Sequence, residues 1–351
     1  MTSDHSSPDR IDSHFSRRDL FRTIGLATGG AMLLGLPKVF GGGIREAEAA
    51  TIDRGFASGN LSLELDGVAA GPVLTAEGGN AFADVILEAV GQDSFQRKRQ
   101  GPAQYEDLLL NMPLGGASRP LSDWIIESLG VNPRPRNGAI VYMDFDFNET
   151  KRLEFFNAVI TEVVIPACDG ADKSPSTLTL HITPQSTRLA GGGGKKLTPA
   201  AGLKSKAAFA GNFRFNVQGL EKACTRIGKV EAITITRVLP AGTSSQDARK
   251  QPLLGAPGSL TVSNIRIFAP EADAGPLYGW FDSMVLKGNA GDERAGVLEW
   301  LDPTMKNVTG SAQLNGLGIL RYAPEGAKAG GTGKLSLVQV DMYCESIKLA
   351  L

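Results

Sequence analysis

Alternating apolar and polar residues predict β-strands over most of the chain beyond residue 60. Residues 61–65 read Leu-Ser-Leu-Glu-Leu and residues 213–217 read Phe-Arg-Phe-Asn-Val, and a Gly follows two residues after each run. A period of two is typical of a strand with one buried face, and the Gly predicts a turn. Further strands are expected at residues 108–110, 139–143, 153–164, 177–182, 260–268, 297–301, 312–322 and 334–340. The pattern therefore favours a mainly β fold.

Two short segments depart from this alternation and predict helices. Residues 120–126 and 276–282 both begin with the order Pro-Leu-x-x-Trp. Proline suits the first turn of a helix, and residues three apart share one helix face. Each helix is therefore expected to lie on a sheet through its Leu and Trp. The four packing residues are Leu121, Trp124, Leu277 and Trp280.

The same order of landmarks occurs twice, which predicts two diverged copies of one domain. Trp124 and Trp280 are 156 positions apart, and Asp144 and Asp302, each after a strand, are 158 apart. The spacing of 158 recurs for two further pairs, Asn157 with Asn315 and Pro166 with Pro324. A chance likeness of two β-rich halves is the alternative. We expect domains at residues 51–188 and 207–351, joined by a flexible Gly-rich linker at residues 189–206.

The first fifty residues have the order of an export signal. Arg17 and Arg18 precede a Gly- and Ala-rich apolar stretch at residues 23–36, and Ala47-Glu48-Ala49 offers a peptidase site near residue 50. The twin arginines favour the Tat route, whose translocase would be a transient partner. The apolar stretch is too short for a stable membrane anchor. The signal residues are Ser16, Arg17, Arg18, Leu20 and Phe21, with a periplasmic or extracellular destination; a chance Arg pair before a buried helix is the alternative.

Composition excludes several classes of function. The net charge of -1 argues against nucleic acid binding, which draws on clustered Lys and Arg. Three cysteines without a C-x-x-C spacing indicate neither a zinc site nor a disulfide framework. We expect them to be buried or unpaired, although a bridge between Cys224 and Cys344 stays open in an oxidising compartment.

Candidate catalytic and ligand-binding residues are few. His181 is the sole histidine beyond the signal, and its place in an alternating strand favours an outward surface position over a general base. Residues 144–150 carry Asp144, Asp146 and Asn148 at alternate positions, which suits a polar turn better than a calcium loop because the EF-hand pattern does not continue. Gly191-Gly192-Gly193-Gly194-Lys195 lacks the spacing of a phosphate-binding loop. No enzyme activity, cofactor or metal is expected.

Residues 85–110 and the helix that follows carry a family resemblance. A strand, Gly91, the run Arg97-Lys98-Arg99-Gln100-Gly101-Pro102 and Tyr105 precede the apolar strand at residues 108–110 and the helix of Trp124. This order resembles the tail tube subunit of contractile phages, and the second copy is similar from residue 251 onward, with Leu253-Leu254-Gly255 in place of the basic run.

The resemblance implies an architecture and a partner. In that family, six copies of a small antiparallel β-barrel or sandwich with one flanking helix form a ring, and a long loop contacts the next ring. Two fused domains would then give a pseudo-sixfold ring of three chains. The subunit-contact loop would comprise Arg97, Lys98, Arg99, Gly101 and Pro102.

Two functions remain open from the sequence. The first is a non-enzymatic, tube-forming structural protein that buries exposed strand edges against copies of itself. The second is a secreted tandem β-sandwich that binds carbohydrate or a surface protein, for which exposed loop aromatics would be the support. A hydrolase ranks third because histidine is scarce.

Overall fold

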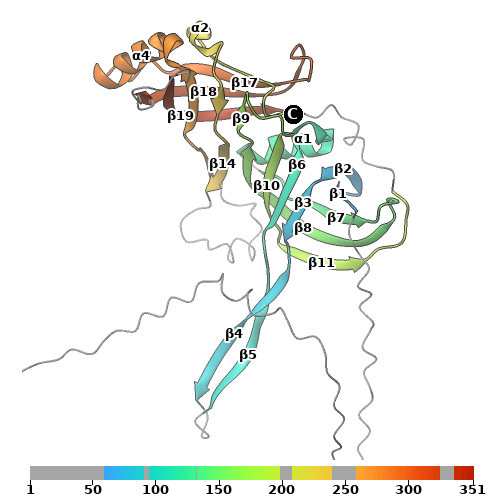
Figure 1. Ribbon diagram of the computed structural model, residues 1–351. Helices are drawn as coiled ribbons and strands as arrows, with labels where there is room; N and C mark the ends of the chain where they lie inside the picture. Colours follow the sequence, from blue (N-terminus) through green and yellow to red (C-terminus); the bar gives the residue numbers. More distant parts are fainter. Residues whose placement is uncertain (1–58, 91–94, 132, 198–207, 239–257, 325–335) are drawn as a thin grey trace, which may run out of the picture. The chain divides into compact units, whose positions relative to one another are not determined.

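The computed structural model describes residues 59–90, 95–131, 133–197, 208–238, 258–324 and 336–351 (Figure 1). These residues all belong to one unit of the chain, residues 54–351. The export-signal residues, the end of the expected linker and the run at residues 251–257 lie outside the described residues. Within the described ranges, the helices are too short or too polar to cross a membrane.

The first half of this unit contains most of the strands. Its elements are β1 (Asn60–Leu65), β2 (Val68–Val73), β3 (Thr75–Gly78), β4 (Ala81–Val90), β5 (Gln96–Tyr105), β6 (Leu108–Pro113), the 3-10 helix η1 (Leu114–Gly116), α1 (Arg119–Ser128), β7 (Arg136–Met143), β8 (Glu149–Ile165), β9 (Cys168–Asp169), β10 (Thr177–Thr183) and β11 (Ser186–Gly191).

The second half contains the remaining helices and strands. Its elements are β12 (Phe213–Val217), α2 (Glu221–Cys224), β13 (Lys229–Val230), β14 (Ile233–Val238), β15 (Ser259–Val262), β16 (Ile265–Pro270), the 3-10 helix η4 (Glu271–Asp273), α4 (Gly275–Phe281), the π-helical turn η5 (Asp282–Leu286), β17 (Arg294–Leu301), β18 (Val308–Pro324) and β19 (Leu337–Ala350).

The mainly β, antiparallel fold expected from the sequence is confirmed. The first sheet contains the order β1-β7-β8-β10-β6-β3 and the second the order β12-β17-β18-β19-β16-β13. The ladders of both paths are antiparallel. The sheets are open, because no pairing among the described strands closes either of them into a barrel. The barrel variant of the expected fold is therefore not what these strands form.

Corresponding turns differ in length, which corrects one equivalence expected from the sequence. Met143 pairs with Glu149 across the β7–β8 turn, whereas Leu301 pairs with Val308 across the β17–β18 turn, so the second turn has one more residue. From this point the halves are 159 positions apart, not 158. Asn157 thus corresponds to Gly316, and both have left-handed backbones, with φ of 47° and 62°.

Both expected helices form, as α1 and α4, and their four packing residues are buried. Leu121 and Leu277 have no exposed surface. Trp124 stacks on Phe155 of β8, with ring centroids 6.3 Å apart. Trp280 donates from Nε1 to the Asp292 carbonyl at 2.8 Å. Trp124 thus joins α1 to the sheet, and Trp280 joins α4 to the segment just before β17. Burial of each large ring stabilises the fold by about 3 kcal/mol.

The first part of the expected linker belongs to the first sheet. Residues 186–191 form β11, which pairs with β8 from Ser186 opposite Phe156 to Gly191 opposite Lys151. Beyond it, the Glu149 amide donates to the Lys195 carbonyl and the Leu197 amide donates to the Phe147 carbonyl. Backbone groups of the expected linker are therefore paired with the first half as far as residue 197.

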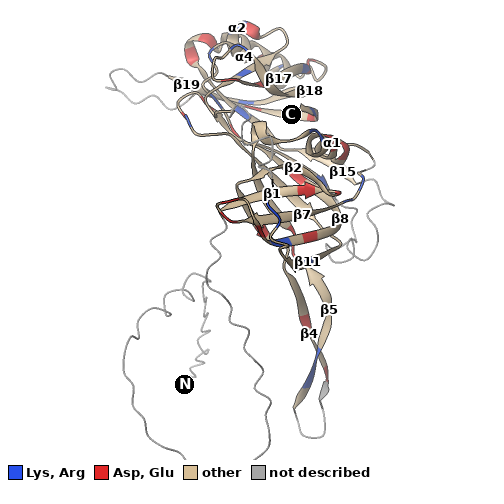
Figure 2. Ribbon diagram, turned by 90° about the vertical axis from the view of Figure 1, so that its right-hand side faces the viewer, with Lys and Arg blue, Asp and Glu red and all other residues tan. Residues whose placement is uncertain are grey.

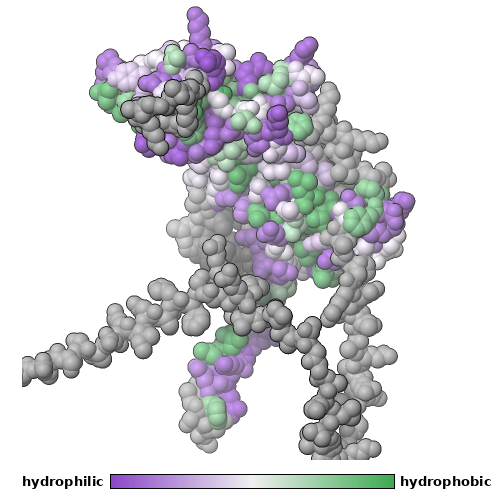
Figure 3. Space-filling model, in the orientation of Figure 1, coloured by the Kyte–Doolittle hydropathy of each residue, from purple (hydrophilic) through white to green (hydrophobic). Residues whose placement is uncertain are grey.

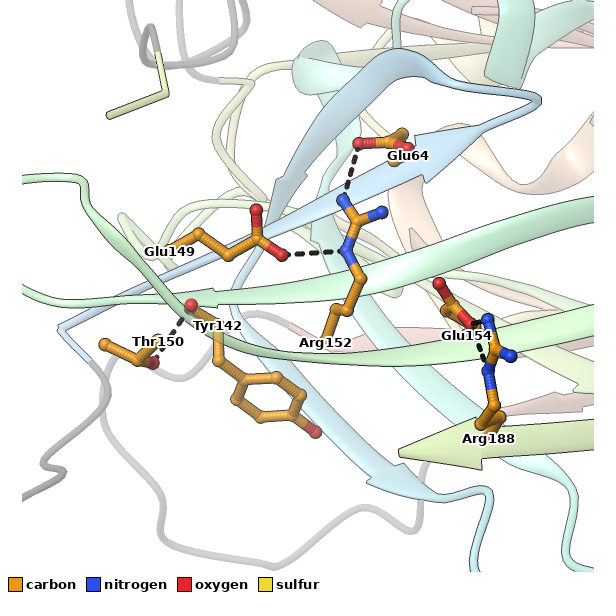
Figure 4. Close-up of polar contacts among 7 residues, drawn as sticks. All are labelled: Glu64, Tyr142, Glu149, Thr150, Arg152, Glu154 and Arg188. Carbon is orange, nitrogen blue, oxygen red and sulfur yellow. Dashed lines mark hydrogen bonds and ion pairs between the residues drawn. The ribbon is translucent and has the colours of Figure 1, made fainter. Parts of the chain in front are cut away.

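Ion pairs cover the outer face of the first sheet (Figures 2 and 4). Arg152 bonds Glu149 at 2.8 Å and Glu64 at 3.1 Å, and Arg188 lies 2.6 Å from Glu154. Burial alone would lower the pKa of Arg152, but the two neighbouring carboxylates outweigh it and raise that pKa. In Figure 2, positions of basic residues (blue) and acidic residues (red) lie near one another on the strands of this sheet. Arg152 and Arg188 on this face thus have their acidic partners within the chain.

Candidate assembly interface

The two halves exchange strands. β14 of the second half pairs with β8 of the first, from Ile233 opposite Ile165 to Thr236 opposite Glu162. In return, β9 of the first half pairs with β13 of the second. Neither half is therefore a closed unit, because each completes a sheet of the other. We call the β14–β8 contact the in-chain interface.

Arg237 is the buried centre of the in-chain interface. Its side chain extends from β14 to the end of α1, where Nη2 donates to the Ser128 carbonyl and, at 2.7 Å, to the Gly130 carbonyl. Nη1 donates to the Gly258 carbonyl at 3.0 Å. Carbonyls at the end of a helix have no partner within the helix and carry partial negative charge. Arg237 satisfies two of them with groups from the other half.

Two other strand edges have no partner among the described strands. β4 pairs with β5 alone, whereas β14 of the β14–β15 hairpin also pairs with β8. β17 pairs with β18 only as far as Leu317. Residues 321–324 of β18 thus pair with β19 on one side and have no described strand on the other. We call this second side the open edge of β18.

An aromatic cluster lies beside the open edge of β18. Tyr278 and Phe281 of α4 contact Tyr322 of β18, with ring centroids 5.3 Å and 6.3 Å away. Tyr278 is 48% exposed, whereas Ser122, two residues before the buried Trp of α1 as Tyr278 is in α4, is buried. Leu320 on the same strand is also exposed. Exposed apolar side chains beside an unpaired strand edge are typical of a contact surface.

The expected contact loop is a strand rather than a loop. Arg97, Lys98, Arg99, Gly101 and Pro102 all lie in β5, which forms a two-stranded ribbon with β4 (Figure 1). Nε of Arg99 lies 2.8 Å from Oε1 of Glu88 on β4, with both side chains largely exposed. The apolar side chains of Val85, Leu87 and Phe95 are exposed as well. Figure 3 shows apolar and polar residues together on this ribbon.

Asp144 and Asp302 stabilise two equivalent turns. Asp144 accepts from the Asp146 and Asn148 amides and from Asn148 Nδ2. Asp302 accepts from Thr304 Oγ1 at 2.6 Å and from Asn307 Nδ2 at 2.8 Å, among other donors. Among the described residues, no His, Cys, Asp and Glu cluster is suited to a metal ion. The carboxylates organise the backbone of each turn, as the polar-turn interpretation of residues 144–148 expects.

These turns predict a defined dependence of stability on pH. Hydrogen bonds from Thr304 and Asn307 hold the pKa of Asp302 well below its usual range. A carboxyl group with a lowered folded-state pKa stabilises the fold above its unfolded-state pKa of about 4, and this stabilisation is lost as the pH falls further. Replacing Asp302 with Asn should reduce the drop in the urea unfolding midpoint between pH 5 and pH 2. An unchanged drop would contradict this role, and Asp123→Asn, at an exposed position of α1, is the control.

The remaining candidates have structural roles in this unit. His181 is on β10 with Nε2 3.2 Å from Oε1 of Glu162, and it is partly exposed. Cys168, Cys224 and Cys344 are buried free thiols, so the possible bridge between the last two is absent. Burial raises the pKa of Cys168 to about 12 and that of Cys224 to about 11, which keeps both thiols protonated.

Comparisons with known proteins identify similar structures. Neither the family models nor the curated proteins compared with this sequence match it. A sheath/tube terminator of the extracellular contractile injection system PVC is 14% identical, with a TM-score of 0.35, over 39% of this chain and 98% of that chain. The PVC sheath-tube complex gives 15% identity and 0.36, over 40% and 94%. Hcp1 from Flavobacterium johnsoniae gives 19% and 0.25, over 39% and 98%.

The two PVC structures contain tube and tube-terminator proteins of a contractile injection system, the class to which the sequence resemblance points.

Sequence reasoning missed the residues that matter most here. Arg237 and the strand around it were not expected, although Ile233-Thr234-Ile235-Thr236-Arg237 alternates in the manner of a half-buried strand. The aromatic cluster was missed because Tyr322 is 44 positions from Tyr278 and 41 from Phe281 in the chain. Tyr278 and Phe281 lie in an expected helix, but only the fold brings Tyr322 to them.

Proposed function

We propose that this chain is a non-enzymatic structural protein that assembles with copies of itself into rings of the tail tube type. The supporting observation is that β14 completes the edge of β8 within the chain, while the corresponding edges of β4 and β18 have no partner among the described strands. The two unpaired edges are different surfaces. A contact between different surfaces of identical chains is heterologous, and it continues from chain to chain until a ring closes.

The proposal includes two tandem copies of one domain. Its support is the same order of strands in both sheets, with the two turn carboxylates and the two left-handed positions in register. If the contact between chains has the same rotation as the in-chain interface and six domains complete a turn, three chains close a pseudo-sixfold ring. The β4–β5 ribbon, with Arg97 to Pro102, would then contact a neighbouring subunit or ring.

The proposal also includes export before assembly. The twin arginines at positions 17 and 18, the apolar stretch after them and the small residues near position 50 support passage through the Tat translocase. The rings would then lie in the periplasm or outside the cell. A fusion of residues 1–60 to a reporter protein, compared with the same fusion carrying Arg17→Lys and Arg18→Lys, tests export separately from assembly.

Size measurement tests the assembly. The purified chain should give trimers or stacked rings by light scattering and annular particles by negative-stain microscopy at micromolar concentration. A monodisperse monomer over the same range would overturn the proposal. In that case the exposed aromatic cluster would favour the second function considered from the sequence, which is binding of carbohydrate or of a surface protein.

A further inference from the structure

We propose that β4 of one chain pairs with the open edge of β18 in the next chain, and that the sizes of the facing side chains distinguish this contact from the in-chain interface. The inference rests on the proposed function. It adds the residues that come into contact between two chains and a reason why first and second halves alternate around the ring. The occupant of the aromatic cluster is therefore a second copy of this chain.

The in-chain interface contains no aromatic side chain among the described residues that meet. The hairpin contributes Ile233, Ile235 and Arg237, which are all buried. Ile235 lies opposite Val163 on β8, and Arg237 reaches the end of α1. Ser122 and Ile125 on α1 and Val163 on β8 are also buried.

Hairpin register identifies the corresponding residues of β4. Ile235 lies opposite Val262, and β16 begins three residues after Val262. Ala81 lies opposite Tyr105, and β6 begins three residues after Tyr105. Ala81 therefore corresponds to Ile235 and Ala83 to Arg237. The hairpin of the first half thus carries Ala at both positions. Gly79, at the position of Ile233, is small for a reason within its own half, because an added Cβ would meet Leu108 and Leu153.

The receiving surface of the second half shows the opposite change. Tyr278 and Phe281 of α4 stand where α1 has Ser122 and Ile125, counted from the two buried tryptophans. Tyr322 stands where β8 has Val163, because Tyr322 lies opposite Val340 and Val163 lies opposite Leu180 at matching places in the two sheets. Large aromatic residues at these places need small residues on the incoming strand.

A second contact follows the same rule. Ser122 Oγ on α1 donates to the carbonyl of Leu351, the residue after β19. Leu351 is thus another residue of the second half that contacts α1. In the first half, β10 and β11 together correspond to β19, and the position of Leu351 is taken by Gly191. The larger Tyr278 would therefore face Gly191 of the next chain. Three positions on one side, Ala81, Ala83 and Gly191, are therefore smaller than their counterparts, while three positions on the other side are larger.

This pattern fixes the order in which domains join. Ile235 and Arg237 are too large to lie on the aromatic cluster without overpacking, and Ala81 and Ala83 would leave cavities on α1. The surface of α1 and β8 therefore accepts only the β14–β15 hairpin. The surface of α4 and β18 accepts only the β4–β5 hairpin, which comes from another chain. Such discrimination by shape prevents the β14–β15 hairpins of different chains from exchanging with β4–β5.

The register of the contact is defined by its in-chain counterpart. Thr234 lies opposite Val164, so Asn80 should lie opposite Ala323 in the next chain. Opposed residues of an antiparallel pair have Cα atoms about 4.5–5.5 Å apart, which suits a disulfide. Neither Asn80 nor Ala323 is fully buried, and the native thiols are buried.

Mixed single-cysteine chains test the register. Full-length Asn80→Cys and Ala323→Cys chains are mixed, oxidised and run on a non-reducing gel, and a linked pair of chains is expected from the mixture alone. The matched control replaces Ala323→Cys with Val308→Cys, at the exposed far end of the same strand. Thr234→Cys with Val164→Cys in one chain is the positive control, which should link within the chain. No linked pair from the 80 and 323 mixture, with assembled wild-type chain present, overturns this inference and leaves the proposed function standing.

A change of side-chain size tests the discrimination. Ala83→Arg should weaken assembly by about tenfold or more, because the larger side chain meets the aromatic cluster. Adding Tyr278→Ser, Phe281→Ile and Tyr322→Val gives the second half the residues of the first and should restore assembly. Circular dichroism checks that each variant is folded. Unchanged assembly of Ala83→Arg, or no recovery in the folded combined variant, overturns matching by size, whereas a monomeric wild-type chain overturns the proposed function itself.

Discussion

Replacing Arg237 with Ala should lower the free energy of unfolding by about 3 kcal/mol, since hydrogen bonds from a charged donor are worth about 1.5–3 kcal/mol each and some are replaced by water. Arg237 is 5% exposed and satisfies three main-chain carbonyls, two of them at the end of α1. Without it, these carbonyls lie at a buried contact with no donor. The in-chain interface would open first, because β14 belongs to the other half of the chain.

Urea unfolding followed by tryptophan fluorescence measures this loss. Arg214→Ala is the matched control, since Arg214 makes an ion pair with Glu299 but is about half exposed. The control should change stability by less than about 1 kcal/mol. Arg237→Lys should recover little, because one ammonium group cannot reproduce the fork that serves three acceptors. Equal, small effects of Arg237→Ala and Arg214→Ala would show that the in-chain interface does not depend on this guanidinium.

Gly138→Ala should destabilise the first sheet by about 3 kcal/mol, the upper part of the range for overpacking a core. A Cβ at this position would meet the Glu64 carbonyl of β1 and the ring of Phe155. The carbonyl is main chain in a paired strand, so it cannot rotate away. The ring is also restrained, because Phe155 is fully buried and stacks on Trp124.

Thermal unfolding of Gly138→Ala and Gly193→Ala gives the comparison. Gly193 follows β11, and an added Cβ there meets nothing within 4 Å. Its replacement should be neutral or slightly stabilising, because the unfolded chain loses freedom. The equivalent Gly296, whose added Cβ would meet Leu317, should behave like Gly138. A Gly138→Ala variant as stable as Gly193→Ala would mean that β1 and β8 can move away from β7 at this point without cost.

Local patterns predicted the elements that depend on neighbours in the sequence. Alternation located β1, β8, β10, β12 and β18, and the order Pro-Leu-x-x-Trp located α1 and α4 with their buried faces. The family resemblance implied a loop at the residues that form β5, and the run Arg97 to Arg99 has no alternation to indicate a strand with a buried face. A two-stranded ribbon exposed on both faces has no such pattern.

The proposed assembly surfaces could not be predicted in the same way. They become visible only when the sizes of corresponding side chains are compared, Ile235 with Ala81 and Val163 with Tyr322. Each of these comparisons requires the register of two ladders. The one-residue difference between the β7–β8 and β17–β18 turns shifts that register. Sequence spacing alone assigned Asn157 to Asn315 and missed the shift.

By itself the sequence determined the fold class, both helices and the repeated order of landmarks, because alternation, Pro at a helix start and Gly in a turn act over a few residues. Only the tertiary structure decided that β14 completes β8, that Arg237 serves the end of α1 and that the corresponding edges of β4 and β18 have no described partner. The physical reason is that strand pairing joins backbone groups that every residue except proline carries alike. Which strands meet is therefore set by the packing of the whole chain.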